Sequence, residues 1–424
     1  NVEFMKYTVP RGTNDILPVE VGLWQQIEAA ARDIFRRYQF QELRTPIFES
    51  TDLFEHSIGG GTDIVEKEMY TFNDKGGRSL TLRPEGTAPI VRSYIEHAMY
   101  KSGAPGKIYY IGPMFRYERP QAGRFRQFHQ AGVEYLGSAH AAADAEVIAL
   151  GIHLFDRLGL RGLSVSINSV GCRVCRPVIE ERLKQFMGAS LHCLCEDCQK
   201  RFHQRPLRIL DCKKQRCQAY FAGLPDIRMS LCHECSDHFN SVLEYLDLIE
   251  IPFTINSRLV RGLDYYTRTT FEIVSDQLGA QNTLCGGGRY DYLVRFLDGP
   301  ETPAVGLAFG LERVVMLLKK LHPEQIFQTG IDVMVAPLGL EQQPVAFRIM
   351  NKLRQMGLAC DADLTKTAIK AHLKQANRLN ARHVAIIGEE EHANQVIQIK
   401  NMATGEQATI PISQLETHFK SHYA

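Results

Sequence analysis

The chain has 424 residues, of which 44% are hydrophobic and 23% charged, so disordered and low-complexity classes are excluded. Single hydrophobic cores stop growing at roughly 250–300 residues, which predicts two or three domains. Its 49 Lys and Arg residues balance 48 Asp and Glu residues, so the overall charge does not indicate a nucleic-acid partner.

Targeting signals are not evident in the sequence. No run approaches the roughly 18 apolar residues of a membrane helix, and the first residues lack the basic start and apolar core of an export signal. We therefore expect a cytosolic protein without membrane contact, and we interpret the residues before Met5 as a vector or processing remnant.

Helical and extended patterns alternate through residues 1–169, which we expect to be the first part of a core domain. Leu23, Ile27 and Ile34 recur at helical spacing, and Pro84 halts an alternating segment. The expected elements, in order, are a helix at 20–38, one strand at 40–48 with Pro46 at an edge or bend, a strand at 79–83, a helix at 86–100, and strands at 107–115 and 130–136 that form a hairpin.

Residues 170–252 are predicted to be a helical, cysteine-rich insertion, and the core domain resumes at 253–329. We expect a strand at 265–274, a tight turn at 286–291 (GGGRYD), and a strand at 304–310 that leads into a helix. Strands paired through hairpins rather than regular βαβ repeats favour an α+β fold with a mixed or antiparallel sheet, and argue against a Rossmann fold.

The pattern of predicted strands and helices changes at residue 330. A strand at 331–337, a helix at 345–356, and strands at 384–387 and 396–399 alternate regularly. This pattern predicts a separate α/β domain at 330–424.

An arginine-rich loop is the first indication of chemistry. Residues 115–126 (FRYERPQAGRFR) hold four arginines and one acidic residue. A guanidinium binds phosphate oxygens bidentately, so the loop suits a polyphosphate or an RNA backbone. A solvated hairpin tip is the ordinary alternative, but the interleaved Phe, Pro and Gln weaken it.

Two further segments place polar residues where buried strands are expected. In 261–268 (RGLDYYTR), the two tyrosines could hydrogen-bond a polar ligand while Arg261 faces an anion, although ordinary sheet tyrosines are an equally good interpretation. In 306–313 (GLAFGLER), small residues permit close approach and Arg313 lies in a first helical turn, which suits an anion. Because Walker and Rossmann glycine signatures are missing from the sequence, any phosphate would be bound by arginines.

Taken in this order, the motifs resemble the histidyl-tRNA synthetases, a family of class II aminoacyl-tRNA synthetases. The resemblance covers nearly the whole chain, through segments 10–15 (PRGTND), the strand ending at Pro46, 115–134, 261–268, 286–291 and 306–313. It implies an antiparallel-sheet catalytic core with a helical insertion, plus a C-terminal anticodon-binding α/β domain. It also implies ATP-dependent ligation of L-histidine to tRNA(His) through histidyl-adenylate, with Mg²⁺, by a homodimer whose contact would involve the Pro46 strand.

Carried over by position, the resemblance gives the catalytic roles to three arginines. Arg116 would hold the α-phosphate of ATP, Arg261 would face the histidine carboxylate and the α-phosphate, and Arg313 would hold distal phosphates. The remaining implied contacts are Arg124, Glu118 and Phe128 with ATP, Glu85, Thr87 and Gln130 with the α-amino group of histidine, and Glu134, Tyr266 and Tyr265 with its imidazole.

The resemblance also implies contacts with tRNA. The family reads an extra 5′ guanosine, and Arg119 and Gln121 have donors suited to guanine and phosphate edges. In the C-terminal domain a basic residue recurs every four positions, which predicts a stripe for the anticodon, although a solvated helix face is a common alternative. The stripe consists of Lys366, Lys370, Lys374, Arg378 and Arg382.

Nine of the eleven cysteines lie within residues 172–235. Structural disulfides are not expected in the cytosol. Four chelate-spaced pairs suffice for one or two structural zinc sites, which we expect far from the chemistry. The alternative is that the cysteines are reduced and pack as small hydrophobic residues. The pairs are Cys172 with Cys175, Cys195 with Cys198 (with Cys193 just before), Cys212 with Cys217, and Cys232 with Cys235.

The main rival interpretation is a non-catalytic paralogue, the regulatory subunit of ATP phosphoribosyltransferase. Such subunits typically lose ATP-site arginines and the C-terminal domain, whereas this chain keeps Arg116, Arg261 and Arg313 together with residues 330–424. A nucleotide-binding domain of another role would leave the histidine signatures unexplained. The enzyme is therefore favoured.

Overall fold

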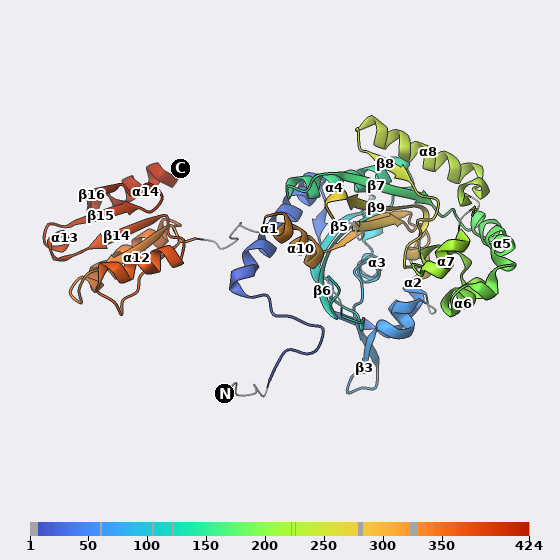
Figure 1. The fold of residues 1–424 in the computed structure, drawn as a ribbon, viewed down its shortest axis with the longest axis horizontal. Coiled ribbons are helices and arrows are strands. Elements are labelled where there is room, and N and C mark those ends of the chain that lie inside the picture. The colour runs from blue at the N-terminus through green and yellow to red at the C-terminus, as the bar shows by residue number, and fades with distance from the viewer. Residues whose placement is uncertain are drawn as a thin grey trace. The chain divides into compact units, whose positions relative to one another are not determined.

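The computed structural model describes residues 7–59, 62–103, 106–120, 123–221, 223–224, 226–278, 283–322 and 330–423, with side chains up to residue 420. The described chain divides into two compact units, which take in residues 23–322 and 330–423 (Figure 1). Within the described ranges, no helix is long and apolar enough to cross a membrane.

An eight-stranded sheet forms the centre of the larger unit as described. Adjacent strands in the interior of the sheet are antiparallel, whereas each of the two edge strands is parallel to its neighbour. The predicted α+β class with a mostly antiparallel sheet is therefore confirmed. In spatial order the strands are β1 (Gln41–Glu42), β5 (Gly106–Phe115), β6 (Gln127–Leu136), β11 (Ala304–Gly310), β10 (Thr283–Arg289), β9 (Thr267–Ser275), β7 (Leu163–Ser169) and β8 (Phe253–Ile255).

The two faces of this sheet carry different side chains. One face packs against α4 (Ala141–Arg157), where the Phe155 and Phe309 rings lie 5.5 Å apart and the fully buried Arg289 pairs with Asp144. Because side chains alternate along a strand, the glycines and polar residues between these positions face the other side. The candidate site lies on that second face.

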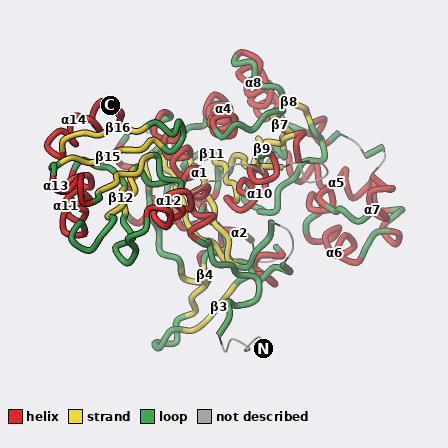
Figure 2. The backbone as a smooth tube through the Cα atoms, turned by 60° about the vertical axis from the view of Figure 1, so that its left-hand side comes forward, coloured by secondary structure: helices red, strands yellow, loops and turns green. Residues whose placement is uncertain are grey.

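The single strand predicted at 40–48 is wrong. β1 ends within this segment, and the next strand begins after Pro46 in a separate sheet. Arg83 accounts for the break, because its guanidinium donates to the carbonyls of Thr45 at 3.0 Å and Pro46 at 3.3 Å. The strands of the second sheet are β2 (Phe48–Ser50), β4 (Ser79–Leu82) and β3 (Tyr70–Asn73), and Figure 2 shows β3 and β4 as a projecting pair.

The tight turn predicted at 286–291 is also wrong, because its glycines lie inside β10. Large neighbouring side chains occupy the space that a side chain on this strand would need. A methyl group at Gly286 would overlap the Arg261 guanidinium, and one at Gly287 would meet Phe271 at 2.5 Å. The run of glycines therefore allows other residues to approach the strand.

Three of the other helices of the larger unit begin close to where the sequence predicts, near residues 20, 86 and 311, whereas the short helices Thr51–Ile58 and Leu293–Phe296 are not predicted. The first buries Leu23, Ile27 and Ile34 on one face, as their spacing indicates. The helix that begins near residue 86 ends at Glu96 rather than at residue 100 and is followed by a 3₁₀ turn. These helices are α1 (Pro18–Arg37), α2 (Thr51–Ile58), α3 (Thr87–Glu96), α9 (Leu293–Phe296) and α10 (Leu311–Leu321).

The cysteine-rich insertion is helical, as predicted, and lies at one side of the large sheet (Figure 1). Its core combines aliphatic residues such as Ile179 and Ile209 with buried cysteines. The last insertion helix packs against α4. The insertion helices are α5 (Cys175–Gly188), α6 (Glu196–Gln204), α7 (Gln215–Gln218) and α8 (His233–Leu248).

The smaller unit has an α/β fold of its own, as predicted. The strand Val333–Pro337 buries Val333 and Val335 in one core and Met334 and Ala336 in another, so helices cover both faces. As described, its five strands are, in spatial order, β13 (Cys360–Asp361), β12 (Val333–Pro337), β14 (His383–Ile387), β15 (Val396–Asn401) and β16 (Gln407–Pro411). Its helices include α11 (Gln343–Gln355), α12 (Ile369–Arg378), α13 (Glu389–Ala393) and α14 (Leu415–Tyr423).

Candidate active site

A cavity of about 200 Å³ opens on the glycine-bearing face of the large sheet. Strands β5, β6, β10 and β11, the start of α3 and the segment 261–266 enclose it. The structure brings together here all six residues that the sequence predicts for histidine. These are Glu85, Thr87, Gln130, Glu134, Tyr265 and Tyr266.

Glu134 is the most buried acidic residue lining this cavity, with 1% of its surface exposed. Its carboxyl accepts hydrogen bonds from Thr87 Oγ1 at 2.7 Å and from the Tyr290 hydroxyl. Burial raises its pKa to about 8, against the lowering effect of these two donors. A methyl group at Gly306 would overlap the carboxyl, so this position requires glycine. A cation in the cavity would favour the ionised form of Glu134.

Glu85 is a second buried carboxyl of the same cavity, 3% exposed. It accepts the backbone N–H of Thr87 at 2.7 Å and of Ala88 at 2.8 Å, groups that the first turn of α3 leaves without helical partners. Burial raises its pKa in spite of these bonds. Two neighbouring buried carboxyls make the cavity selective for a positively charged group.

Four tyrosines complete the lining, and two of them are missed by the sequence reasoning. The ring of Tyr265 lies 4.9 Å from Tyr266 and 5.6 Å from Tyr290, and the Tyr110 hydroxyl donates to Gln130 Oε1 at 3.3 Å. Tyr290 belongs to the 286–291 motif. Tyr110 lies on β5 six positions before Arg116, which directly follows the strand, so alternation with a period of two could have indicated that both face the same side.

A second cavity of about 260 Å³ holds the residues that the sequence predicts for ATP. Arg124 Nη1 lies 3.2 Å from Glu118 Oε2, and the Arg116 guanidinium lies 5.4 Å from the centre of the Phe128 ring. Burial and the like charge of Arg124 lower the pKa of Arg313. Its lining includes Arg116, Glu118, Arg124, Phe128, Gln130, Arg261, Glu312 and Arg313. Converging arginines of this kind favour an anion with several charges.

Arg261 lies where the two cavities meet, since it lines both of them, as do Arg116 and Gln130. It pairs with Glu272 on β9, whose other oxygen accepts from Thr283 Oγ1 at 2.8 Å. Burial would lower the pKa of Arg261, but Glu272 raises it. The Nε donor of Arg261 is buried, and none of the residues that the structure describes accepts a hydrogen bond from it. Sequence reasoning missed Glu272, which only strand pairing brings to this position.

The residues predicted for tRNA are not part of these cavities. Arg119 is exposed just beyond the arginine-lined cavity, and Gln121 lies outside the described residues. The basic stripe is shorter than predicted, because Lys366 and Arg382 fall outside α12 and pair with Asp363 and Asp332. The exposed stripe members on α12 are Lys370, Lys374 and Arg378.

The predicted cysteine pairs come together as two groups of four. Cys172 and Cys175 meet Cys232 and Cys235, and in each group the four sulfur atoms lie within 4.8 Å of one another. The second group consists of Cys195, Cys198, Cys212 and Cys217. Cys193 belongs to neither group.

Comparisons with known proteins agree over almost the full length. The family model described as histidyl-tRNA synthetase matches residues 12–182 and 218–314, and the anticodon binding domain model matches residues 332–422. A histidine–tRNA ligase of Pelotomaculum thermopropionicum is 49% identical over 408 residues, 96% of each chain. That of Geobacillus thermodenitrificans is 50% identical over 414 residues, 97% of each chain.

Solved structures give the same result. The apo S. aureus histidyl-tRNA synthetase superposes with a TM-score of 0.83 at 41% identity, covering 98% of this chain and 100% of that one. The Bacillus halodurans ATP phosphoribosyltransferase regulatory subunit/histidyl-tRNA synthetase covers 92% of this chain and 100% of its own, with a TM-score of 0.67 at 23% identity, a likeness of fold alone. Given the family models and the full-length relatives, this chain belongs to the histidyl-tRNA synthetase family.

Proposed function

We propose that this chain ligates L-histidine to tRNA(His) in the cytoplasm. The reaction is ATP-dependent, passes through histidyl-adenylate, and releases pyrophosphate and AMP. The observation that carries the proposal is the junction of two cavities, one lined by buried carboxyls and phenols and the other by arginines. A carboxylate held in the first cavity meets an α-phosphate held in the second.

Histidine occupies the carboxyl-lined cavity in this proposal. Glu85 and Thr87 bind its α-ammonium group, with Gln130 beside them, and Glu134 and Tyr266 read the imidazole with support from Tyr265. Hydrogen-bonding groups this deeply buried reject an amino acid that leaves them unpaired, by a much larger factor than an apolar pocket achieves. The demand for a cation created by Glu85 and Glu134 supports this placement.

ATP occupies the arginine-lined cavity. Phe128 stacks on the adenine near Glu118, and Arg124 and Arg313 hold the distal phosphates. The histidine carboxylate attacks the α-phosphorus, which builds negative charge that Arg116 and Arg261 neutralise from fixed positions. The buried Nε of Arg261 supports this role, because within the described part of the chain it has no acceptor and so leaves a donor for an incoming oxygen.

Magnesium is implied by the family, and the donor set fits it. Mg²⁺ prefers carboxylate and phosphate oxygens, and the side chains of Glu118 and Glu312 line the same cavity as the phosphate-binding arginines. These two residues would hold the ion together with ATP. When bound, the ion neutralises charge on the phosphates.

Contacts with tRNA extend beyond the cavities. We place Arg119 and Gln121 at the acceptor end, and Lys370, Lys374 and Arg378 at the anticodon. Support for the second contact comes from the exposure of the three residues on one helix, where the described chain offers them no acidic partner.

A homodimer completes the proposal. The segment that begins the second sheet exposes Ile47 and Phe48 at 45% and 47%, and Phe72 on a nearby strand is exposed at 44%. Exposed apolar side chains gathered in one place are typical of protein contacts. Light scattering of the full chain should give twice the mass of a monomer, and Phe48→Glu should reduce the measured mass to that of one monomer.

Pyrophosphate exchange into ATP tests the function directly. Exchange should require histidine among the twenty amino acids. Arg261→Ala should lower its rate 10²–10³-fold at unchanged fold, since loss of one donor to developing charge costs about 3–4 kcal/mol. The exposed Arg258→Ala is the matched control and should leave the rate unchanged. If none of the twenty amino acids supports exchange, the result would favour the regulatory subunit. Exchange that depends on an amino acid other than histidine would refute the assignment of the first cavity.

A further inference from the structure

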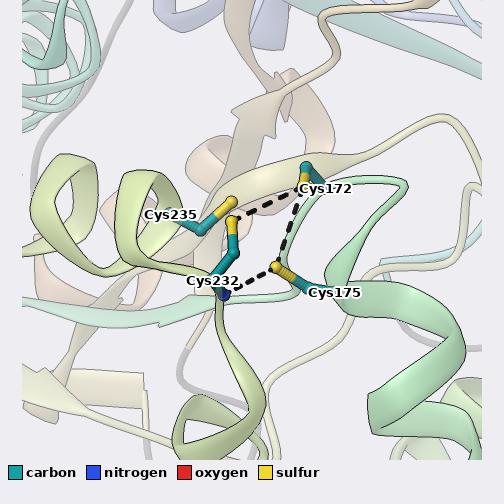
Figure 3. A group of neighbouring side chains, drawn as sticks. All are labelled: Cys172, Cys175, Cys232 and Cys235. Carbon is teal, nitrogen blue, oxygen red and sulfur yellow. Dashed lines mark hydrogen bonds between the residues drawn. The ribbon is translucent and has the colours of Figure 1, made fainter.

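The first cysteine group has the dimensions of a metal centre. Cys172 Sγ lies 3.7 Å from Cys175 Sγ and 3.9 Å from Cys232 Sγ, with Cys235 beside them (Figure 3). Four thiolates around Zn²⁺ at about 2.3 Å define a tetrahedron with edges of about 3.8 Å. A disulfide would bring two of the sulfur atoms to about 2.05 Å.

The second group repeats this geometry with a different set of segments. Cys195 Sγ and Cys212 Sγ lie 3.9 Å apart, and all four sulfur atoms are buried. Backbone N–H groups donate to sulfur in both groups, from Cys232 to Cys175 at 3.0 Å and from Cys195 to Cys217 at 3.2 Å. Donors aimed at sulfur suit thiolates that carry negative charge.

Packing of reduced cysteines as small hydrophobes explains burial but not the grouping. Each group consists of two chelate-spaced pairs that are separated along the chain. The sulfur atoms of both pairs nevertheless lie within 4.8 Å of one another. Seven of the eighteen buried residues of the insertion core are cysteines. A small module of this kind gains much of its stability from a metal.

The first group connects the insertion to the histidine cavity. It fixes the start of α5, from which Arg176 donates to the carbonyls of Tyr266 at 2.7 Å and Asp264 at 3.3 Å. Directly before the group, the backbone of residues 170–171 exchanges hydrogen bonds with Arg268. The segment that carries the two cavity tyrosines is therefore held from the insertion side.

The second group connects to the same segment at its other end. The chain between its two cysteine pairs presents Arg205, which pairs with Asp264 at 2.5 Å, and Arg208, whose Nη1 donates to the Arg261 carbonyl at 2.6 Å. Arg208 is largely buried in this contact. Both groups thus reach residues 261–266, a segment that lines the first cavity and whose Arg261 lines both.

We propose that each cysteine group binds one Zn²⁺ ion and that the two loaded centres position residues 261–266 for histidine binding. The metals are structural, and they act on the site through Arg176, Arg205 and Arg208. The sequence alone predicts metal far from the chemistry. The cysteines of both groups are not among the residues that line the two candidate cavities, but through these arginines their effect reaches the histidine cavity. The effect on histidine binding rests on the proposed function, whereas the metal content does not.

Metal analysis of the full chain, purified without chelator, tests the first part. The expected content is two zinc ions per chain. Cys232→Ser with Cys235→Ser should reduce it to one, as should Cys212→Ser with Cys217→Ser, and the control Cys193→Ser should leave two. If a double variant does not fold, zinc released from the wild type by a mercurial reagent is counted instead. Two ions per chain support the proposal, while one ion, less than one, or iron in place of zinc overturns it.

Calorimetric titration with histidine tests the positioning part. Arg176→Ala should keep two zinc ions and weaken histidine binding about tenfold, with ATP binding changed less than twofold. Arg176→Lys should recover part of the loss, because it restores a donor. Wild-type histidine affinity in Arg176→Ala with both ions present would overturn the positioning role. If neither the wild type nor Arg176→Ala binds histidine, the proposed function is refuted instead. The zinc content then remains the test of the two metal centres.

Discussion

Replacing Glu134 by Gln should make the unliganded protein more stable at neutral pH while removing its affinity for histidine. Burial raises the folded-state pKa of this carboxyl from its ordinary value of 4.5 to about 8. Folding therefore favours the protonated form, and the stability that this contributes is fully present below pH 4.5 and is lost as pH rises through 8. At pH 7 the loss amounts to about 3 kcal/mol.

The amide does not ionise, so the variant avoids this loss. Its NH₂ group must, however, face one of the two hydroxyls that now donate to Glu134, which costs about 1 kcal/mol. The net gain of about 2 kcal/mol at pH 7 should raise Tm by roughly 3–6 °C, and it should turn into a loss of up to about 1 kcal/mol below pH 4.5, where the wild-type carboxyl is largely protonated in the folded and unfolded states.

Thermal unfolding of variant and wild type between pH 4.5 and 8 measures this difference. Glu55→Gln, at an exposed position on α2, is the control and should leave the unfolding temperature close to that of the wild type throughout this range. A difference between Glu134→Gln and wild type that does not change with pH would refute the reasoning. So would a variant that is still stabilised by histidine as strongly as the wild type.

Three further predictions follow from the same contacts. Asp144→Asn should lower the free energy of unfolding by about 3–5 kcal/mol at neutral pH, because it leaves Arg289 buried without its charged partner. Arg289 lowers the pKa of Asp144 to about 2, against the effect of burial. The difference in urea midpoint between variant and wild type should therefore shrink as pH falls through that value. Gly306→Ala should place a methyl group against the Glu134 carboxyl and raise the histidine KM in pyrophosphate exchange, with a smaller effect on the KM for ATP. Lys370→Glu with Lys374→Glu should weaken tRNA binding and flatten its salt dependence by about one unit of slope per lost phosphate contact, leaving pyrophosphate exchange unchanged.

Local sequence patterns predicted the parts of the fold that depend on local structure. The hairpin of β5 and β6 follows from alternation on both sides of a charged loop, and α1 from the spacing of Leu23, Ile27 and Ile34. The glycines of β10 were misread as a turn, because glycine is common in turns and its use here depends on Arg261, from the segment before β9, and on Phe271 of β9.

The candidate site was predicted where a motif names the residue and missed where pairing decides the contact. Tyr290 reaches Glu134 because β10 lies beside β11 and β11 beside β6, and Glu272 reaches Arg261 through the pairing of β9. The grouping of the eight cysteines likewise depends on tertiary structure, since their spacing allows several arrangements.

Aminoacylation of tRNA(His) by the full chain tests the central claim most directly. With ATP, Mg²⁺ and radiolabelled histidine, we expect about one histidine per tRNA(His) at the plateau and none on a tRNA of another specificity. Histidine-dependent pyrophosphate exchange without any transfer to tRNA(His) would contradict the account, as would equal charging of both tRNAs.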